Sequence, residues 1–222
     1  MLANLLLTGT DSRAGKTTVG CALAFALKVR ALRVGVMKPV ETGCIEQEGG
    51  LVAADGAALV ASASAALPME LVSPYRYVSA LAPAAAAEAA GEPLPDFADI
   101  CEAYHQIAAR SEVTIVEETG GLAAPLDWQR NFADLALELN LTPLLVVANR
   151  GAFIGTAALT IDYATRRGIA PCGFIINALE PAASARAERD AQAVLRATGT
   201  PCLGTMRFKE PLSLAIVERL LA

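Results

Sequence analysis

Residues 9–18, GTDSRAGKTT, constrain the fold of this chain more than any other stretch of its sequence. The apolar run ANLLL precedes them, and the run VGCALAFALKV follows them. A strand that turns through glycine straight into a helix directs several backbone N–H groups and the helix N-terminus at one spot, which attracts an anion. The stretch therefore predicts a phosphate-binding loop between a strand and a helix.

The side chains of this loop suit the phosphates of a nucleotide. Lys16 supplies a positive charge for the β- and γ-phosphates, and Thr17 supplies a hydroxyl for Mg²⁺, as in P-loops. The spacing departs from the strict motif, because five residues separate Gly9 from Gly15 and Thr10 stands where that motif has its first glycine. The alternative interpretation is an ordinary turn that carries a surface lysine.

Short apolar runs alternate with helical patterns along the rest of the chain, which predicts parallel strands joined by crossover helices. We expect an α/β fold, with residues 1–222 forming a single doubly wound P-loop NTPase-like domain. Its central sheet would be mostly parallel with helices on both faces, and residues 66–96 would be a loop-rich insertion with a helix over AAAAEAA. The predicted strands cover residues 3–8, 32–38, 113–118, 142–148, 171–177 and 200–206.

The net charge and the spacing of the cysteines limit the kinds of partner that this protein could bind. The net charge is −5, and Lys and Arg are scattered along the chain, which argues against nucleic acid and favours a small-molecule ligand. The five cysteines form no C-x-x-C pair, as expected of reduced thiols. No apolar run has the length of a membrane span or the form of a signal peptide, so we expect a cytoplasmic protein without a membrane partner.

Carboxylates at strand ends are the candidate Mg²⁺ ligands. Glu117 ends the run VTIVE and is followed by Gly120 and Gly121, which would allow a phosphate or metal to approach closely. Asp55 precedes a helical pattern, and metal binding and a helix N-cap are equally good interpretations of it. Glu118 is also acidic, but its side chain should point away from that of Glu117 because neighbouring strand residues face opposite ways.

A second lysine should approach the phosphate site. Lys38 ends the run LRVGVMK, and ligands of open α/β sheets gather at the carboxyl ends of strands, so Lys38 and Lys16 can converge. Thr42 and Gly43 follow in VETGC and offer a hydroxyl and an accessible backbone. The alternative for Lys38 is a solvated surface charge.

Taken together, the motifs resemble the dethiobiotin synthetase family over nearly the whole chain. The P-loop alone is common to many families, but the ordered set that includes K-P-V-x-T-G and the A-P-x-x-A-A helix is specific to this one. The matching stretches are TGTDSRAGKTT, GVMKPVETG, ADGAAL, YRYVSALAPAAAAEAAG, VTIVEETGGLAAPL, NFADLALEL, TPLLVVA and GFIINAL.

The resemblance implies an ATP-dependent ring closure in biotin biosynthesis. In that reaction 7,8-diaminopelargonate takes up CO₂ as a carbamate, ATP phosphorylates the carbamate, and the second amine attacks the mixed carbamic-phosphoric anhydride to give dethiobiotin. It also implies Mg²⁺ as cofactor and a homodimer, in which a loop of one subunit reaches the substrate of the other.

Site roles follow from the resemblance by position. Lys16 and Lys38 would be catalytic, Thr17, Asp55 and Glu117 would hold Mg²⁺, and Asn177 would read the adenine edge. The substrate would contact Thr42 and the helix start formed by Ala152, Phe153, Ile154 and Gly155. The nucleotide site would comprise Arg13, Ala14, Gly15, Lys16, Thr17, Thr18, Asp55, Glu117, Glu118, Thr119, Gly120 and Asn177.

Three stretches differ from the family pattern. EETGG replaces E-G-[AV]-G-G, GAFIGT at 151–156 replaces L-G-x-I-N-H, and Arg207 and Phe208 stand near the position of a late proline. The altered 151–156 loop motivates one alternative, a related P-loop ligase that acts on another substrate. A ParA/MinD-like nucleotide switch is a second alternative, although Thr10, Asp11 and Ser12 stand where such switches carry an extra lysine. A small-molecule kinase is a third, although no arginine-rich lid segment is visible.

Overall fold

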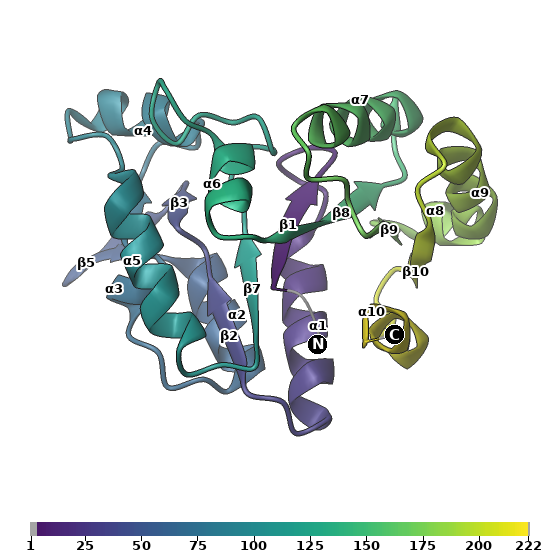
Figure 1. Cartoon of the computed structure of the whole chain (residues 1–222), viewed down its shortest axis with the longest axis horizontal. Helices are drawn as coiled ribbons and strands as arrows, with labels where there is room; N and C mark the ends of the chain where they lie inside the picture. Colours follow the sequence, from purple (N-terminus) through teal and green to yellow (C-terminus); the bar gives the residue numbers. More distant parts are fainter. Residues whose placement is uncertain (1–3, 222) are drawn as a thin grey trace.

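The computed structural model describes residues 4–221 and has a central sheet of six parallel strands (Figure 1). Every predicted strand is present in this sheet, whose order is β10-β9-β8-β1-β7-β2. The strands are β1 (Leu5–Gly9), β2 (Val34–Met37), β7 (Val113–Glu117), β8 (Thr142–Ala148), β9 (Gly173–Asn177) and β10 (Cys202–Met206). The expected α/β fold with a parallel sheet is confirmed.

The strand order places β1 at the point where the direction of winding reverses. β1 pairs in parallel with β7 on one side and with β8 on the other. The chain leaves β1 toward β2, returns to fill the gap with β7, and then builds β8, β9 and β10 on the opposite side. Ligands of open α/β sheets bind at this kind of reversal, beyond the carboxyl ends of the strands.

Helices cover both faces because successive strand residues point to opposite faces. Leu5 and Leu7 of β1 pack into the cluster with α1, α2 and α10, whereas Leu6 faces the opposite cluster with α5 and α6. On that second face α7 and α9 cover β8 and β9. Bounds are α1 (Lys16–Val29), α2 (Ala54–Ala63), α5 (Phe97–Ala108), α6 (Phe132–Glu138), α7 (Phe153–Arg166), α8 (Pro181–Ala185), α9 (Ala187–Thr198) and α10 (Leu214–Leu221).

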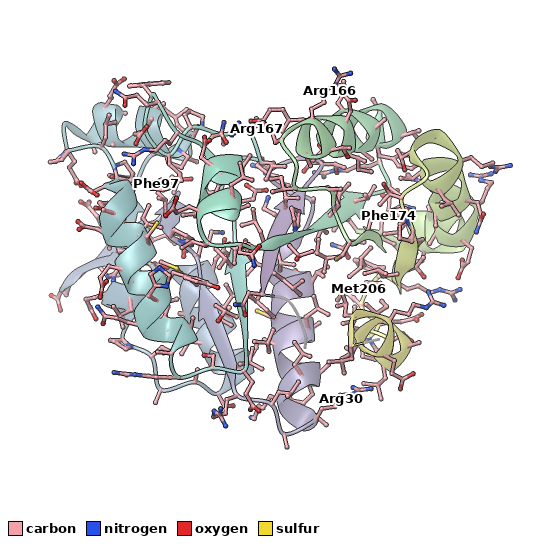
Figure 2. All side chains as sticks on the ribbon, viewed as in Figure 1. Arg30, Phe97, Arg166, Arg167, Phe174 and Met206 are labelled. Carbon is pink, nitrogen blue, oxygen red and sulfur yellow. The ribbon has the colours of Figure 1, made fainter. Side chains whose placement is uncertain are left out.

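Side chains fill the space between the sheet and its helices (Figure 2). Phe174 of β9 is fully buried, and Met206 of β10 is 9% exposed. Arg166 lies at the end of α7 and projects outward, whereas Arg30, the C-cap of α1, pairs with Glu218 of α10 at 3.2 Å (Figure 2). Within residues 4–221 we find no helix with the length and apolarity needed to span a bilayer.

Residues 66–96 contain more regular structure than the expected loop-rich insertion. They form α3 (Met69–Val72), β6 (Tyr75–Tyr77) and α4 (Pro83–Ala90), the last of which is the expected alanine-rich helix. β6 pairs in parallel with β3 (Val40–Thr42), and β4 (Ile45–Gln47) forms an antiparallel hairpin with β5 (Gly50–Val52). The expectation missed the strands because three residues are too few to show a period of two.

Candidate active site

Strand register brings the predicted residues to one edge of the sheet. Leu7 of β1 lies opposite Glu117, and Met37 of β2 lies opposite Val116, so Lys38 follows at the level of Glu117. The P-loop leaves β1 two residues beyond Leu7. A cavity of about 470 Å³ opens here. It is lined by Ser12, Arg13, Gly15, Lys16, Thr17, Thr18, Lys38, Thr42, Asp55, Ala80, Glu117, Glu118, Thr119 and Gly120.

The P-loop is held by its own backbone and by β9. Gly15 caps α1 with a φ of 83°, and a Cβ there would lie 2.1 Å from Asn177 Nδ2, so only glycine fits. Asn177 ends β9 and donates its amide to the carbonyl of Ala14 at 2.8 Å. Lys16 is only 5% exposed, and its ammonium donates to the carbonyl of Asp11 at 3.3 Å.

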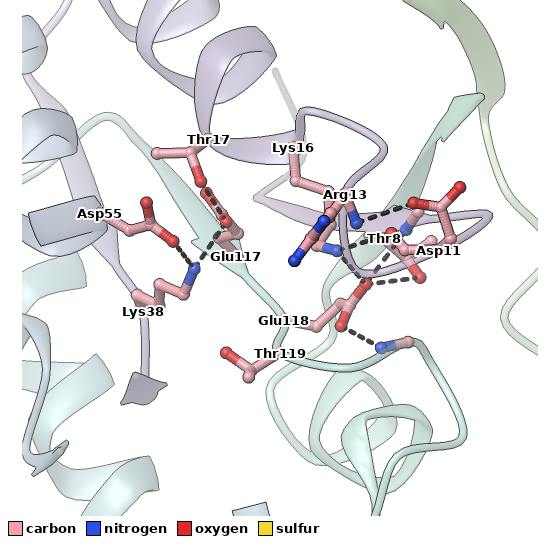
Figure 3. A network of polar contacts seen from close by, with 12 residues as sticks. Thr8, Asp11, Arg13, Lys16, Thr17, Lys38, Asp55, Glu117, Glu118 and Thr119 are labelled. Carbon is pink, nitrogen blue, oxygen red and sulfur yellow. Dashed lines mark hydrogen bonds and ion pairs between the residues drawn. The ribbon is translucent and has the colours of Figure 1, made fainter. Parts of the chain in front are cut away.

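Thr17, Lys38, Asp55 and Glu117 converge across the cavity from different segments of the chain (Figure 3). The Thr17 hydroxyl donates to Glu117 Oε1 at 2.7 Å, and Lys38 Nζ donates to the same oxygen at 2.9 Å. Lys38 also contacts the carboxylate of Asp55. The solvated alternative for Lys38 is wrong, because Lys38 is 5% exposed and faces two carboxylates.

Burial and neighbouring charges have opposite effects on the pKa values of Lys38 and Glu117. Burial alone would lower the pKa of the Lys38 ammonium, but the carboxylates of Glu117 and Asp55 outweigh it and raise that pKa. Burial also raises the pKa of Glu117, against the opposing pull of Lys38 and Thr17. The raised pKa of Lys38 favours its charged form, whereas the raised pKa of Glu117 favours its neutral form. We take the pair as ionised, because one ammonium faces two carboxylates at contact distance.

The same cluster fits Mg²⁺ in its donor chemistry. Two carboxylates and a hydroxyl meet at the cavity, and the buried Oε2 of Glu117 has no hydrogen-bond partner within the described chain. Across residues 4–221 no three Asp, Glu, His or Cys side chains form a metal-binding group. The protein would therefore supply only part of the coordination, as is usual where Mg²⁺ also binds waters and nucleotide phosphates.

Glu118 faces away from Glu117, as expected, and reaches the P-loop lysine. Its carboxylate is fully buried and lies 3.3 Å from Lys16 Nζ. It also accepts the backbone N–H of Gly9 at 3.1 Å and that of Gly121 (Figure 3). The sequence pattern predicted the direction of this side chain but gave no sign of its partner.

Asp55 owes its position to a residue that the sequence pattern did not single out. Glu41 of β3 is 4% exposed, and its two carboxylate oxygens accept the N–H groups of Asp55 and Gly56 at 2.8 and 2.9 Å. The N-cap interpretation of Asp55 is wrong, since Ala53 occupies that position and Asp55 lies in the first turn of α2. No local pattern could reveal Glu41, because its partners lie 14 and 15 residues away.

Two further side chains tie the loops of the site together. Thr119 donates its hydroxyl to the carbonyl of Val40 at 2.5 Å, which joins the loop after β7 to the segment that follows Lys38. Arg150, also missed, pairs with Asp11 at 3.0 Å and donates to the carbonyl of Arg13 at 3.3 Å. The P-loop is thereby braced against the loop after β8.

Ala152, Phe153, Ile154 and Gly155 form the start of α7, with Ala152 as its N-cap. None of them lines the 470 Å³ cavity within this chain. A second cavity of about 590 Å³ adjoins the first at Gly120 and lies between the P-loop, residues 120–125 and the middle of α7. A larger groove of about 810 Å³ lies between α5 and α6 and shares no lining residue with the 470 Å³ cavity.

The parallel sheet, the loop after β1 and the lysine and threonine at its end define a P-loop NTPase fold. Solved structures agree in fold: the MinC:MinD cell division protein complex of Aquifex aeolicus has a TM-score of 0.57 and 13% identity, covering 98% of this chain and 86% of that one. A ParA family ATPase from Chlorobium tepidum has a TM-score of 0.54 and 15% identity, covering 100% and 90%.

Sequence comparison gives a narrower assignment. A family model described as an AAA domain matches residues 3–214. The ATP-dependent dethiobiotin synthetase of Anaeromyxobacter dehalogenans is 36% identical, with 96% of this chain and 89% of that protein covered. The enzyme of the same name from Pseudomonas aeruginosa is 35% identical, with 96% and 94% covered. The chain belongs to the dethiobiotin synthetase family.

Proposed function

We propose that this protein is an ATP-dependent dethiobiotin synthetase, a ligase of biotin biosynthesis. The observation that carries the proposal is the convergence of two buried lysines, Lys16 and Lys38, on one cavity that also holds Thr17, Asp55 and Glu117. Phosphoryl transfer depends mainly on positioning and on stabilising charge, and these residues supply both. Residues 1–222 would act as a single ligase domain.

The reaction has three steps, and each of them suits this site. An amine of 7,8-diaminopelargonate adds to CO₂ and loses a proton, which gives a carbamate. A carbamate oxygen then attacks the γ-phosphorus of ATP, and ADP leaves. The second amine attacks the carbonyl carbon of the resulting anhydride, so that the ring closes, phosphate leaves and a proton passes to solvent. The dethiobiotin so formed keeps the carbon of CO₂.

The two lysines would lie on opposite sides of the transferred phosphoryl group. Lys16 lies in the P-loop and would neutralise the β- and γ-phosphates, whereas Lys38 lies across the cavity and would contact the carbamate and the incoming oxygen. Thr17, Asp55 and Glu117 would hold Mg²⁺, which when bound neutralises charge on the phosphates. The amide of Asn177 borders the P-loop at Ala14 and would read the base.

The substrate would occupy the second cavity and reach Thr42 near the first. Leu122, Ala124 and Leu159 line this cavity and suit an aliphatic chain. We propose a homodimer in which residues 152–155 of one subunit bind the substrate carboxylate of the other through backbone N–H groups at the start of α7. Two exposed apolar side chains on that helix, Ile154 at 37% and Leu159 at 72%, support such a contact. The unpaired cysteines support a cytoplasmic location.

Incubation with diaminopelargonate, bicarbonate and MgATP tests the proposal. We expect dethiobiotin by mass spectrometry, with one ADP released per product. ATP consumption that no diamine accelerates would contradict it. A related ligase with another substrate is the second candidate, favoured by the altered 151–156 loop, and it predicts that a different diamine or carboxylate accelerates ADP release while diaminopelargonate does not.

A further inference from the structure

The P-loop lysine of this protein, Lys16, forms an ion pair with a buried carboxylate. The Glu118 side chain has no exposed surface and lies 3.3 Å from Nζ of Lys16, whose side chain is also buried. We propose that Glu118 is the internal counterion of Lys16. Its charge makes the site select nucleotide that carries a metal over nucleotide that carries none. This inference rests on the proposed nucleotide site.

The Glu118 carboxylate is held by hydrogen-bond donors other than Lys16. It accepts the backbone N–H of Gly9 at 3.1 Å and the backbone N–H of Gly121, and the hydroxyl of Thr8 lies 3.5 Å away. These donors come from β1 and from the loop after β7, so the carboxylate is held from two sides. Lys16, by contrast, sits on a flexible stem and can turn toward a phosphate.

The formal charges of the side chains that line the cavity cancel. Three basic side chains line it, and so do three acidic ones: Arg13, Lys16, Lys38, Asp55, Glu117 and Glu118. A polyphosphate without metal is therefore attracted by the backbone N–H groups of the P-loop but meets side chains with no net charge, and it displaces the Lys16–Glu118 pair. It then lies beside a buried carboxylate, at short range and with little water to screen the repulsion.

A bound Mg²⁺ ion changes this balance. Held by Thr17, Asp55 and Glu117, it would add two positive charges to the site. The metal thus offsets the repulsion that Glu118 exerts on the phosphates, so nucleotide with metal is admitted and nucleotide without metal is disfavoured. Without Glu118 the cavity would carry a net positive charge and would accept both forms.

Titration calorimetry with ADP, in Mg²⁺ and separately in EDTA, tests this inference without turnover. Glu118→Gln removes the charge and keeps one oxygen, which can replace the acceptor of Gly9 (Oε1) or that of Gly121 (Oε2), but not both. We expect it to bind metal-free ADP about tenfold more tightly than wild type, with a smaller gain in Mg²⁺. Glu118→Ala removes the same charge and should show the same direction. Glu112→Gln is the matched control, because Glu112 directly precedes β7, whereas Glu118 directly follows it. Glu112 pairs with Arg33, and its substitution should leave both affinities unchanged.

Unchanged or weaker binding of metal-free ADP by folded Glu118→Gln or Glu118→Ala overturns the inference and leaves the ligase proposal standing. Equal affinity of wild type for ADP in Mg²⁺ and in EDTA also overturns it, whatever the variants do. A wild-type protein that binds no ADP even in Mg²⁺ overturns both proposals together.

Discussion

At the scale of single residues, Lys16 and Lys38 differ in what surrounds them. Lys16 contacts the P-loop carbonyl of Asp11 and the carboxylate of Glu118, whereas Lys38 bridges Asp55 and Glu117. Lys16 is therefore placed to bind a phosphate that is already present in the nucleotide. Lys38 is placed near the proposed metal ligands, where the new bond to phosphorus would form.

Substitution of each lysine should separate these two roles. We expect Lys16→Ala to lower both nucleotide affinity and turnover, and Lys38→Ala to lower turnover by about a hundredfold or more while nucleotide affinity changes less. Calorimetry with ADP and a steady-state assay of dethiobiotin formation measure the two effects. Equal losses of nucleotide affinity in both variants would contradict this division.

Glu117 should set the requirement for Mg²⁺. Glu117→Gln keeps the size of the side chain and an acceptor for Thr17, but it removes the charge that the metal binds. We expect the apparent Mg²⁺ affinity, measured from the Mg²⁺ dependence of ADP binding, to fall by about tenfold to a hundredfold. Glu112→Gln again serves as the control, and a normal Mg²⁺ dependence in Glu117→Gln would place the metal elsewhere.

The sequence predicted the residues of the site better than their partners. Lys16, Lys38 and Glu117 could be placed because each stands at or just beyond the end of an apolar strand, and strand ends of a parallel sheet meet at one edge. The partners Glu41 and Glu118 depend on contacts across 14 and about a hundred residues of chain, respectively. A one-dimensional pattern carries no information about such contacts.

At the scale of elements, the six central strands were predictable because each is a nearly continuous apolar run covered on both faces. The three-residue strands β3 and β6 were not, since Val40 and Tyr77 are buried while the other residues of these strands are polar or only partly buried. β3 nevertheless carries Glu41, and so it connects the sheet edge to the helix that holds Asp55.

Glu41 should stabilise the first turn of α2. Glu41→Ala leaves the N–H groups of Asp55 and Gly56 without their acceptors, and we expect it to cost about 1–2 kcal/mol of unfolding free energy. Faster hydrogen exchange at these two amides and a weaker Mg²⁺ dependence of ADP binding should accompany the loss. Glu41→Gln retains an acceptor and should lose less, so a Gln variant as unstable as the Ala variant would count against this role.

The turn at Asp127 should make stability depend on pH. Burial alone would raise the pKa of Asp127, but the N–H groups of Gln129 and Arg130, both donating at 2.7 Å, and the Arg130 guanidinium outweigh it and lower that pKa below its ordinary value. The stabilisation is therefore fully present above the ordinary aspartate pKa and is lost as the pH falls through the lower folded value.

Asp127→Asn reports this contribution directly. Urea unfolding of wild type and variant over a series of pH values should give a difference in unfolding free energy that is largest near neutral pH, about 1–2 kcal/mol. The difference should shrink as the pH falls below the ordinary aspartate value. A difference that stays constant or grows in acid would show that the carboxylate charge is not what stabilises the turn.

At the scale of the whole molecule, the proposed homodimer needs two chains for each complete site. Residues 152–155 stand at the start of α7 and line neither cavity within their own chain. A Cβ added at Gly155 would have no atom of the same chain within 4 Å, so a side chain there does not disturb packing within the subunit.

Gly155→Asp tests this arrangement against Gly155→Asn, which has the same size without the charge. We expect the KM for diaminopelargonate to rise about tenfold in the Asp variant and to change little in the Asn variant. ADP affinity should stay near that of wild type in both. An unchanged KM in Gly155→Asp would place the substrate carboxylate elsewhere and favour the related-ligase alternative.

In the proposed reaction ATP activates a carbamate oxygen, and the fate of that oxygen tests the proposal most directly. With ¹⁸O-labelled bicarbonate, in a run that is short compared with exchange of the label into water, the phosphate released beside dethiobiotin should carry one ¹⁸O atom. Mass spectrometry of the phosphate measures this. Unlabelled phosphate formed together with dethiobiotin would contradict the proposed chemistry, because ATP would then have been hydrolysed by water rather than attacked by the carbamate.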